Sequence, residues 1–277
     1  MAPIDSPLTL SLALLACWAV VGAVGLLRPH SVALVRRVLF PLGALIGVGL
    51  AIVAALSLAE PVEHATLHIG LPDLPTHVRL DNLSRVFLAL LGSASAGVSL
   101  FAAGYFRKGE GTAPGVLGLQ YHLFLASMGF VLVADDAYAF MVAWETMALT
   151  SYFLVTAQHG IPEIRSAGFL YLLMAHVGAI AILLSFGILQ GGTWLFSFDA
   201  MRASTLSTPW ATAAFLLALF GFGAKAGLLP LHVWLPEAHP AAPSPVSALM
   251  SGVMLKTAIY GVLRVTFDLI GDPLWWW

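Results

Sequence analysis

Long runs of apolar residues, separated by short polar segments, dominate the chain. Eight runs are long enough to cross the roughly 30 Å hydrocarbon core of a bilayer as an α-helix. None has the strict alternation of apolar and polar positions that is typical of membrane β-barrel strands. Because backbone groups in lipid must be satisfied within their own segment, the pattern predicts an all-α polytopic membrane protein. The predicted transmembrane helices lie at about 8–27, 38–58, 82–103, 116–134, 137–158, 166–189, 209–238 and 243–268.

The composition supports lipid as the solvent. Only 9% of the residues are charged and 60% are hydrophobic, whereas a soluble domain carries charge on about a quarter of its residues. The net charge of -2 gives no indication of nucleic-acid binding. Cys17 is the single cysteine, which excludes an internal disulfide, a cysteine-ligated iron–sulfur cluster and a thiolate zinc site. We therefore expect a lipid-embedded chain with no cofactor, no metal and no catalytic centre of its own.

Charges in the predicted loops indicate the orientation. One side carries basic residues and the other carries acidic ones, and the basic side is expected to face the cytoplasm. Residues 59–81 then form an exterior loop or a short hairpin, and the N-terminus lies outside. No basic residue precedes the first apolar run, so this run is a retained helix and not a signal peptide. The basic residues are Arg28, Arg36, Arg37, Arg107, Lys108 and Arg165, the acidic ones are Glu60, Glu63, Asp73, Asp135, Asp136 and Asp199, and Arg79 and Arg202 are exceptions.

Each of the last four predicted helices carries an ionisable residue at mid-membrane depth: Glu145, His176, Lys225 and Lys256. A charged side chain at the centre of a membrane helix costs roughly 2.5 to 3.5 kcal/mol, so such residues usually face the bundle interior and form ion or proton routes. Two alternatives remain open. The acid and the lysines could form structural salt bridges between helices, and the histidine could be a satisfied core residue.

The seventh predicted helix contains a break signal. Pro230 lies inside its apolar run and is followed by His232 and His239. Proline removes a backbone donor and clashes with the preceding turn, so the helix should break or kink near Leu229. In transporters such breaks mark ion or substrate paths, and Lys225 lies within about two turns of this one.

These residues together predict a proton relay. Removal from water favours the neutral form of a lysine, whereas a nearby carboxylate favours the charged form. If Glu145 pairs with Lys225, the pairing holds the proton on Lys225, and separation of the two residues releases it. The proton would then move through His176 or water to Lys256.

Several segments resemble one family, the antiporter-like proton-channel subunits. The stretch KAGLLPLHVWLPEAHPAAPSPVSALMSGVMLKTAIYG, Lys225 to Gly261, is similar to the family signature. WETMALTSYFLV around Glu145 resembles the fifth-helix glutamate motif, and DNLSRVF from Asp81 resembles the entry to the third helix. The family includes large membrane subunits of respiratory complex I, multi-subunit sodium/proton antiporters, and component B of hydrogenase-4 with its formate hydrogenlyase relatives. APSPVSALMSGVMLK and LIGDPLW resemble the hydrogenase-4 branch most.

The resemblance assigns a role to each position. It implies that Glu145 is an ion-pair partner, Lys225 the lysine of the broken helix and Lys256 the lysine of the eighth helix. His232 and His239 fall on the polar stretch from which a route to cytoplasmic water begins. The resemblance also implies a bacterial inner membrane and partner subunits that hold the redox or hydrogenase module.

The resemblance also predicts the domain division. Such subunits resemble two inverted five-helix repeats after three initial helices, and this chain carries the first repeat alone. We expect three helices with the exterior loop in 1–110, a repeat of helices four to eight in 111–268, and a truncated tail in 269–277. The chain would then be a truncated or split gene product, or a shortened version.

Three functions follow as hypotheses. Moving one charge against 100 mV requires about 2.3 kcal/mol, and no nucleotide loop or haem motif here supplies it. The first hypothesis is therefore a proton-translocating subunit of a redox-driven complex of the NADH-quinone oxidoreductase or membrane-bound hydrogenase type. The second is a subunit of a secondary sodium/proton antiporter, in which sodium is a further substrate. The third is a membrane scaffold that conducts nothing.

Overall fold

The protein is described by a computed structural model covering residues 6–71, 74–106 and 111–271. These residues contain eight helical segments long and apolar enough to span a membrane, which confirms the predicted fold class. Two segments begin earlier than predicted, at Val32 and Pro162, because helical structure continues past the apolar run into polar residues such as Arg36 and Glu163. The spans are Pro7–Leu27, Val32–Leu56, Asn82–Tyr105, Pro114–Val133, Ala137–Val155, Pro162–Leu189, Thr208–Ala241 and Ser244–Leu269.

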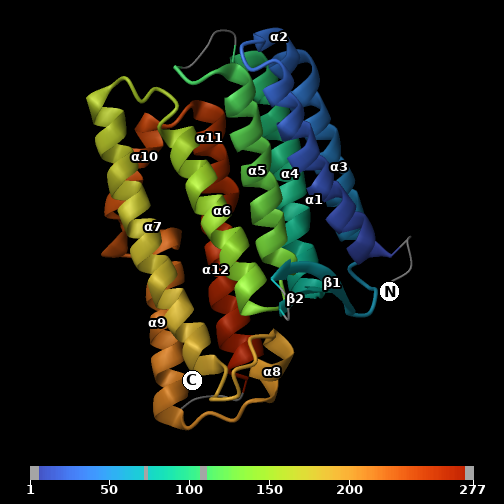
Figure 1. Ribbon diagram of the computed structural model, residues 1–277, viewed down its shortest axis with the longest axis vertical. Helices are drawn as coiled ribbons and strands as arrows, with labels where there is room; N and C mark the ends of the chain where they lie inside the picture. The colour runs from blue at the N-terminus through green and yellow to red at the C-terminus, as the bar shows by residue number, and fades with distance from the viewer. Residues whose placement is uncertain (1–5, 72–73, 107–110, 272–277) are drawn as a thin grey trace.

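The spans run alternately up and down the bundle (Figure 1). The second and eighth contain π-helical segments, Val35–Leu39, Met250–Met254 and Arg264–Leu269, and 3₁₀ turns lie at Gly25–Leu27 and Leu231–Trp234. The helices are α1 (Pro7–Val24), α2 (Val32–Leu34), α3 (Phe40–Leu56), α4 (Asn82–Tyr105), α5 (Pro114–Val133), α6 (Ala137–Val155), α7 (Pro162–Leu189), α8 (Phe198–Ala203), α9 (Thr208–Ala226), α10 (Leu235–Ala241), α11 (Ser244–Leu249) and α12 (Leu255–Leu263).

Local sequence signals fix where several helices begin. Asp81 accepts a hydrogen bond from the backbone N–H of Ser84 at 2.9 Å and caps α4. Asp136 caps α6 in the same way, through the N–H of Ala139 at 2.6 Å. These side chains satisfy amide donors that have no partner within their own helix. α5, α7 and α9 instead have proline in their first turn, where a missing N–H costs nothing.

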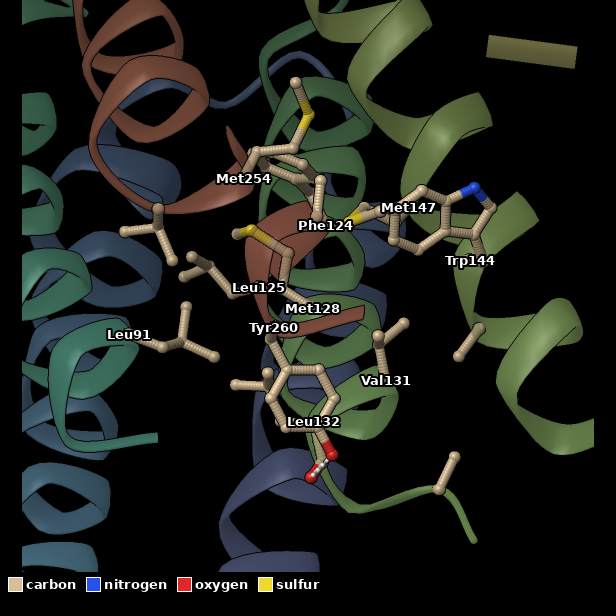
Figure 2. Packing of buried hydrophobic residues seen from close by; sticks show 14 of the residues in the cluster. Leu91, Phe124, Leu125, Met128, Val131, Leu132, Trp144, Met147, Met254 and Tyr260 are labelled. Carbon is tan, nitrogen blue, oxygen red and sulfur yellow. Dashed lines mark hydrogen bonds between the residues drawn. The ribbon is translucent and has the colours of Figure 1, made fainter. Parts of the chain in front are cut away.

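The core is built around α5. Thirteen of the 20 residues of α5 are buried, compared with five of the 18 residues of α1, so α5 is enclosed by its neighbours whereas α1 lies at the edge. Figure 2 shows Phe124 and Met128 of α5 among residues from α4, α6 and the eighth span, with the Tyr260 hydroxyl donating to the Leu132 carbonyl. Close helix packing of this kind replaces the hydrophobic effect as the main association force in lipid.

Residues 63–71 and 74–80 form the two strands of an antiparallel hairpin, which is the second form predicted for the 59–81 loop. β1 (Glu63–Leu71) pairs with β2 (Leu74–Leu80) in a register that places Glu63 opposite Leu80, with an irregularity between Leu67 and Gly70. The hairpin lies at the same end of the bundle as α8 (Figure 1). The predicted division into 1–110, 111–268 and 269–277 stays a prediction.

The seventh span is broken, as predicted. α9 ends at Ala226, and Gly227 adopts a left-handed conformation with φ of 74°. Glycine reaches this region without steric cost, so it stops the helix two residues before the predicted position at Leu229. The chain then passes Pro230, makes the 3₁₀ turn and continues as α10.

Candidate functional site

Lys225 lies in the last turn of α9 and is almost completely enclosed, with 3% of its surface exposed. Its Nζ donates a hydrogen bond to the Tyr171 hydroxyl of α7 at 2.5 Å, and the ammonium lies 4.6 Å from the centre of that ring. The Tyr171 oxygen is also 2.5 Å from Ser151 Oγ of α6. The direct contacts of the buried lysine are therefore neutral groups.

Glu145 does not form the predicted ion pair with Lys225. Its carboxylate lies 3.5 Å from His176 Nε2 of α7, and no pair within 4.0 Å joins it to the lysine in the described chain. At about 100° per residue, Glu145 and Ser151 lie about 120° apart around α6. Because Ser151 turns inward to Tyr171, Glu145 turns toward the outer surface.

Glu145 and His176 line an open groove of about 580 Å³ between α6 and α7. Their side chains are 31% and 48% exposed, and most of the other lining residues are apolar. His176 Nδ1 is 2.9 Å from the Leu172 carbonyl, so this nitrogen carries a proton and donates it to the carbonyl. Nε2 can then donate to Glu145 only as imidazolium, or accept from a protonated carboxyl. The two side chains therefore form an ion pair only when His176 is protonated.

Part of the polar stretch that follows the helix break packs near Lys225. Trp234 Nε1 donates to the Ala224 carbonyl at 2.8 Å, which satisfies an acceptor near the end of α9. The Trp234 ring packs on Tyr171 with centroids 5.0 Å apart, and His239 stacks on Trp234 with centroids 6.5 Å apart. His239 Nδ1 is 2.8 Å from Ser247 Oγ. Aromatic contacts thus join His239 to the cluster formed by Lys225, Tyr171 and Ser151.

His232 and Lys256 make no side-chain hydrogen bond to this cluster in the described structure. His232 Nδ1 is buried without a hydrogen-bond partner in the described structure. The Lys256 side chain is exposed on the eighth span, and its Nζ donates to the Ser251 carbonyl at 2.6 Å. The π-helical segment Met250–Met254 does contact the cluster, because the Tyr171 hydroxyl donates to Met254 Sδ at 3.6 Å. The described side chains give no continuous line from Lys225 through His176 to Lys256.

A network of charged residues at the end of the bundle that carries α8 was not predicted. Arg264 donates two hydrogen bonds to Asp81 and one to Asp268, and Arg202 bridges Asp268 and Asp135. The network joins the start of α4, the loop before α6, α8 and the end of the eighth span. The signal in the sequence was that Arg79 and Arg202 violate the charge asymmetry of the loops. Neighbouring aspartates neutralise both, since Arg79 lies 3.6 Å from Asp81 and Asp268.

This network sets the charge states of its members outside the spans. Burial alone would raise the pKa of Asp81, but the Arg264 guanidinium outweighs it and holds that pKa well below its usual range. Burial would lower the pKa of Arg202, but Asp268 and Asp135 keep it above its ordinary value. His64, Asp135 and Asp199 bring possible metal ligands within 4.8 Å of one another. Both carboxylates already pair with Arg202, so the guanidinium supplies the positive charge there.

Comparison with known proteins gives consistent matches. The family described as NADH:quinone oxidoreductase/Mrp antiporter, transmembrane region, matches residues 134–277. The chain is 43% identical to hydrogenase-4 component B of Escherichia coli K12, over 79% of this chain and 31% of that protein. It is 30% identical to formate hydrogenlyase subunit 3 of the same organism, over 72% of this chain and 31% of that one.

The fold matches as well. A chain in the structure of the Mrp complex from Dietzia sp. DQ12-45-1b superposes with a TM-score of 0.77 at 26% identity, covering 95% of this chain and 28% of that chain. The chain spans about a third of the length of the curated relatives it matches, 31% in the two cases above. The resemblance predicted from the sequence around Glu145 and from Lys225 to Gly261 is thereby confirmed.

Proposed function

Because the chain belongs to the NADH:quinone oxidoreductase/Mrp antiporter transmembrane family, we propose that it is a proton-translocating subunit of a redox-driven membrane complex. The observation that carries this proposal is Lys225, which is enclosed at a helix break and is held by a neutral hydroxyl. An ammonium removed from water without a direct counter-ion is poised to lose its proton. A purely structural lysine would be expected to have a paired carboxylate.

In the proposed mechanism, Glu145 and His176 act on Lys225 through the electric field and not by contact. While Glu145 is an ionised carboxylate beside a neutral His176, its negative charge would favour the protonated form of Lys225. When a proton joins the Glu145–His176 pair, the negative charge is neutralised and Lys225 loses that support. Proton uptake in the groove between α6 and α7 therefore favours proton release at Lys225.

The released proton needs a path away from the cluster. His239 is connected to it through Trp234 and Tyr171, and His232 has a buried nitrogen free to accept a hydrogen bond. We assign both to the water-accessible side of the break. Lys256 is the proposed next carrier, and water must connect it, because the described side chains make no direct link.

The test is redox-driven proton uptake into vesicles that hold the assembled complex. Glu145→Gln and Lys225→Ala, singly and together, should abolish most uptake, with electron transfer retained or slowed in step. Glu163→Gln changes an exposed glutamate in the first turn of α7 and serves as the matched control. Normal pumping by both single variants would contradict the proposal and return the residues to a structural role.

His176 separates the field mechanism from direct pairing. His176→Phe removes the imidazole that would share a proton with Glu145 in the groove. Proton uptake should therefore fall, although the surroundings of Lys225 are untouched. If Glu145 instead pairs directly with Lys225 during the cycle, this variant should pump normally. The two mechanisms are distinguished by measuring redox-driven proton uptake of His176→Phe and of the unmodified protein at several pH values.

A second candidate function is secondary sodium/proton antiport, favoured by the structural match to the Mrp complex. It would use the same lysine without an electron donor. Exchange of sodium for protons, driven by a pH gradient in vesicles without redox substrates, would support antiport. The scaffold hypothesis requires that Lys225→Ala leaves every transport assay unchanged.

The membrane setting belongs to the same proposal. The chain is a multi-pass membrane protein, and the homologous hydrogenase-4 component supports a bacterial inner membrane. We place the end with Arg28, Arg36 and Arg37 at the cytoplasm and the N-terminus outside, as the loop charges predict. Other membrane subunits are the proposed partners, with protons, and in the second candidate sodium, as substrates.

A further inference from the structure

An open groove of about 380 Å³ lies where the first span ends and the second begins. Its walls are apolar side chains, among them Leu27 and Val38, and Arg28 and Arg37 also line it. Leu27 and Val38 are 79% and 41% exposed, so the walls face outward. Figure 1 shows this end of the bundle, marked by α2, opposite the hairpin and α8. The groove therefore lies at the level where these helices leave the hydrocarbon core.

The two arginines have no counter-charge in the described structure. Both are exposed and neither makes a hydrogen bond or ion pair with another described residue, unlike Arg36, whose Nε donates to the Ala103 carbonyl at 3.0 Å. Residues 6–59 and 111–134, which build and flank the groove, contain no aspartate or glutamate. An anion that balances Arg28 and Arg37 must therefore come from beyond these segments.

The groove is also held in shape. The Gly115 N–H donates to the Pro29 carbonyl at 2.7 Å, which fixes the loop between the spans against the start of α5. Ser31 accepts a hydrogen bond from the Leu34 N–H through its side-chain oxygen at 3.2 Å. Its hydroxyl hydrogen remains available to a ligand. The groove thus presents two guanidinium groups and a hydroxyl donor above an apolar wall.

We propose that this groove binds one anionic phospholipid. Its phosphate would lie between Arg28 and Arg37, where charge-assisted hydrogen bonds are strongest, and an acyl chain would cover Leu27 and Val38. Basic pockets between membrane helices on the cytoplasmic side are suited to such headgroups. Charge complementarity favours an anionic lipid over a zwitterionic one, and the apolar wall favours a lipid over free phosphate. This site does not depend on the proposed proton transport.

The test is native mass spectrometry of the purified protein titrated with phosphatidylglycerol or phosphatidylcholine. Each arginine near the surface should contribute about fivefold in affinity for the anionic lipid, so Arg28→Gln/Arg37→Gln should retain it on the order of 25-fold more weakly. Phosphatidylcholine retention should not change. Arg165→Gln, an exposed arginine at the same end of the bundle, is the charge control and should behave as the unmodified protein.

A second variant tests the shape of the groove. Val38→Trp fills the apolar wall and keeps both charges, so it should also weaken retention of phosphatidylglycerol. Thermal unfolding of each variant checks that the fold is intact. Equal retention of phosphatidylglycerol by the double variant and the unmodified protein would overturn the proposal. So would displacement of the lipid by inorganic phosphate at equal concentration, since the site would then be one for a free anion.

Discussion

At the residue scale, the buried environment of Lys225 separates it from the other ionisable residues of the spans. It is 3% exposed, whereas His176 and Lys256 lie on the outer surface of the described bundle. Residue type and depth along a helix are visible in the sequence, but the direction of a side chain is not. That direction depends on which neighbours the helix packs against, and Tyr171, an ordinary tyrosine in the sequence, is the neighbour that matters.

We predict that Tyr171→Phe destabilises the protein through the loss of its bond to Lys225. A hydrogen bond to a charged group contributes about 1.5 to 3 kcal/mol, and the variant leaves the ammonium without its acceptor. Thermal unfolding in detergent measures the effect. Tyr138→Phe, in which the tyrosine is 39% exposed, should have little effect.

The lysine itself provides the stricter check. In a Lys225→Met background there is no ammonium to satisfy, so Tyr171→Phe should cost much less. The difference between the two costs is the coupling energy of the pair. Equal costs in both backgrounds would mean that the tyrosine stabilises the protein through its other contacts, with Ser151 or Met254.

At the element scale, the sequence determined most of the helices but not all of their interruptions. Eight apolar runs predicted eight spans, and Pro230 predicted the break in the seventh. The π-helical segments were missed, because no residue type marks them as proline marks a break. The exact end of α9 was also missed, because the break was predicted near Leu229, whereas Gly227 has a positive φ and ends the helix earlier.

Gly227→Ala should therefore destabilise the break. A side chain at φ of 74° costs roughly 1 to 2 kcal/mol, and its Cβ would also meet the Leu235 side chain. Gly187→Ala in α7 is the matched control, because an added Cβ there meets nothing within 4 Å. Removing a glycine from a helix interior should stabilise it by about 0.5 to 1 kcal/mol. Unfolding temperatures that move in the same direction for both variants would contradict this account.

At the scale of the whole molecule, one charged network links the parts that the sequence analysis treated separately. Arg264 of the eighth span binds Asp81 before α4, and Arg202 of α8 binds Asp135 and Asp268. Arg264 and Asp81 are 183 positions apart in the sequence, so no local pattern could reveal their pairing. The third and eighth spans are therefore held together at this end by charge as well as by packing.

Asp81→Asn tests this link without removing the cap of α4, because asparagine caps helices as well as aspartate does. Breaking one partner of a buried ion pair costs about 3 to 5 kcal/mol, and Arg264 is 4% exposed and Asp81 8%. We expect a clear fall in unfolding temperature at neutral pH. Asp199→Asn removes a carboxylate whose side chain is 68% exposed and should cost little.

The contribution of the Asp81 carboxylate to stability should depend on pH in a defined direction. The pKa of Asp81 in the folded protein lies below its ordinary value of 3.8, because Arg264 outweighs the effect of burial. Such a group contributes its full stability above the unfolded pKa and loses it as the pH falls toward the folded one. The difference in stability between the unmodified protein and Asp81→Asn should thus be constant from pH 8 to about 5 and shrink only below about 4. A difference that shrinks between pH 7 and 5 would mean that Asp81 is already protonated there and that the pair with Arg264 does not hold the two spans together.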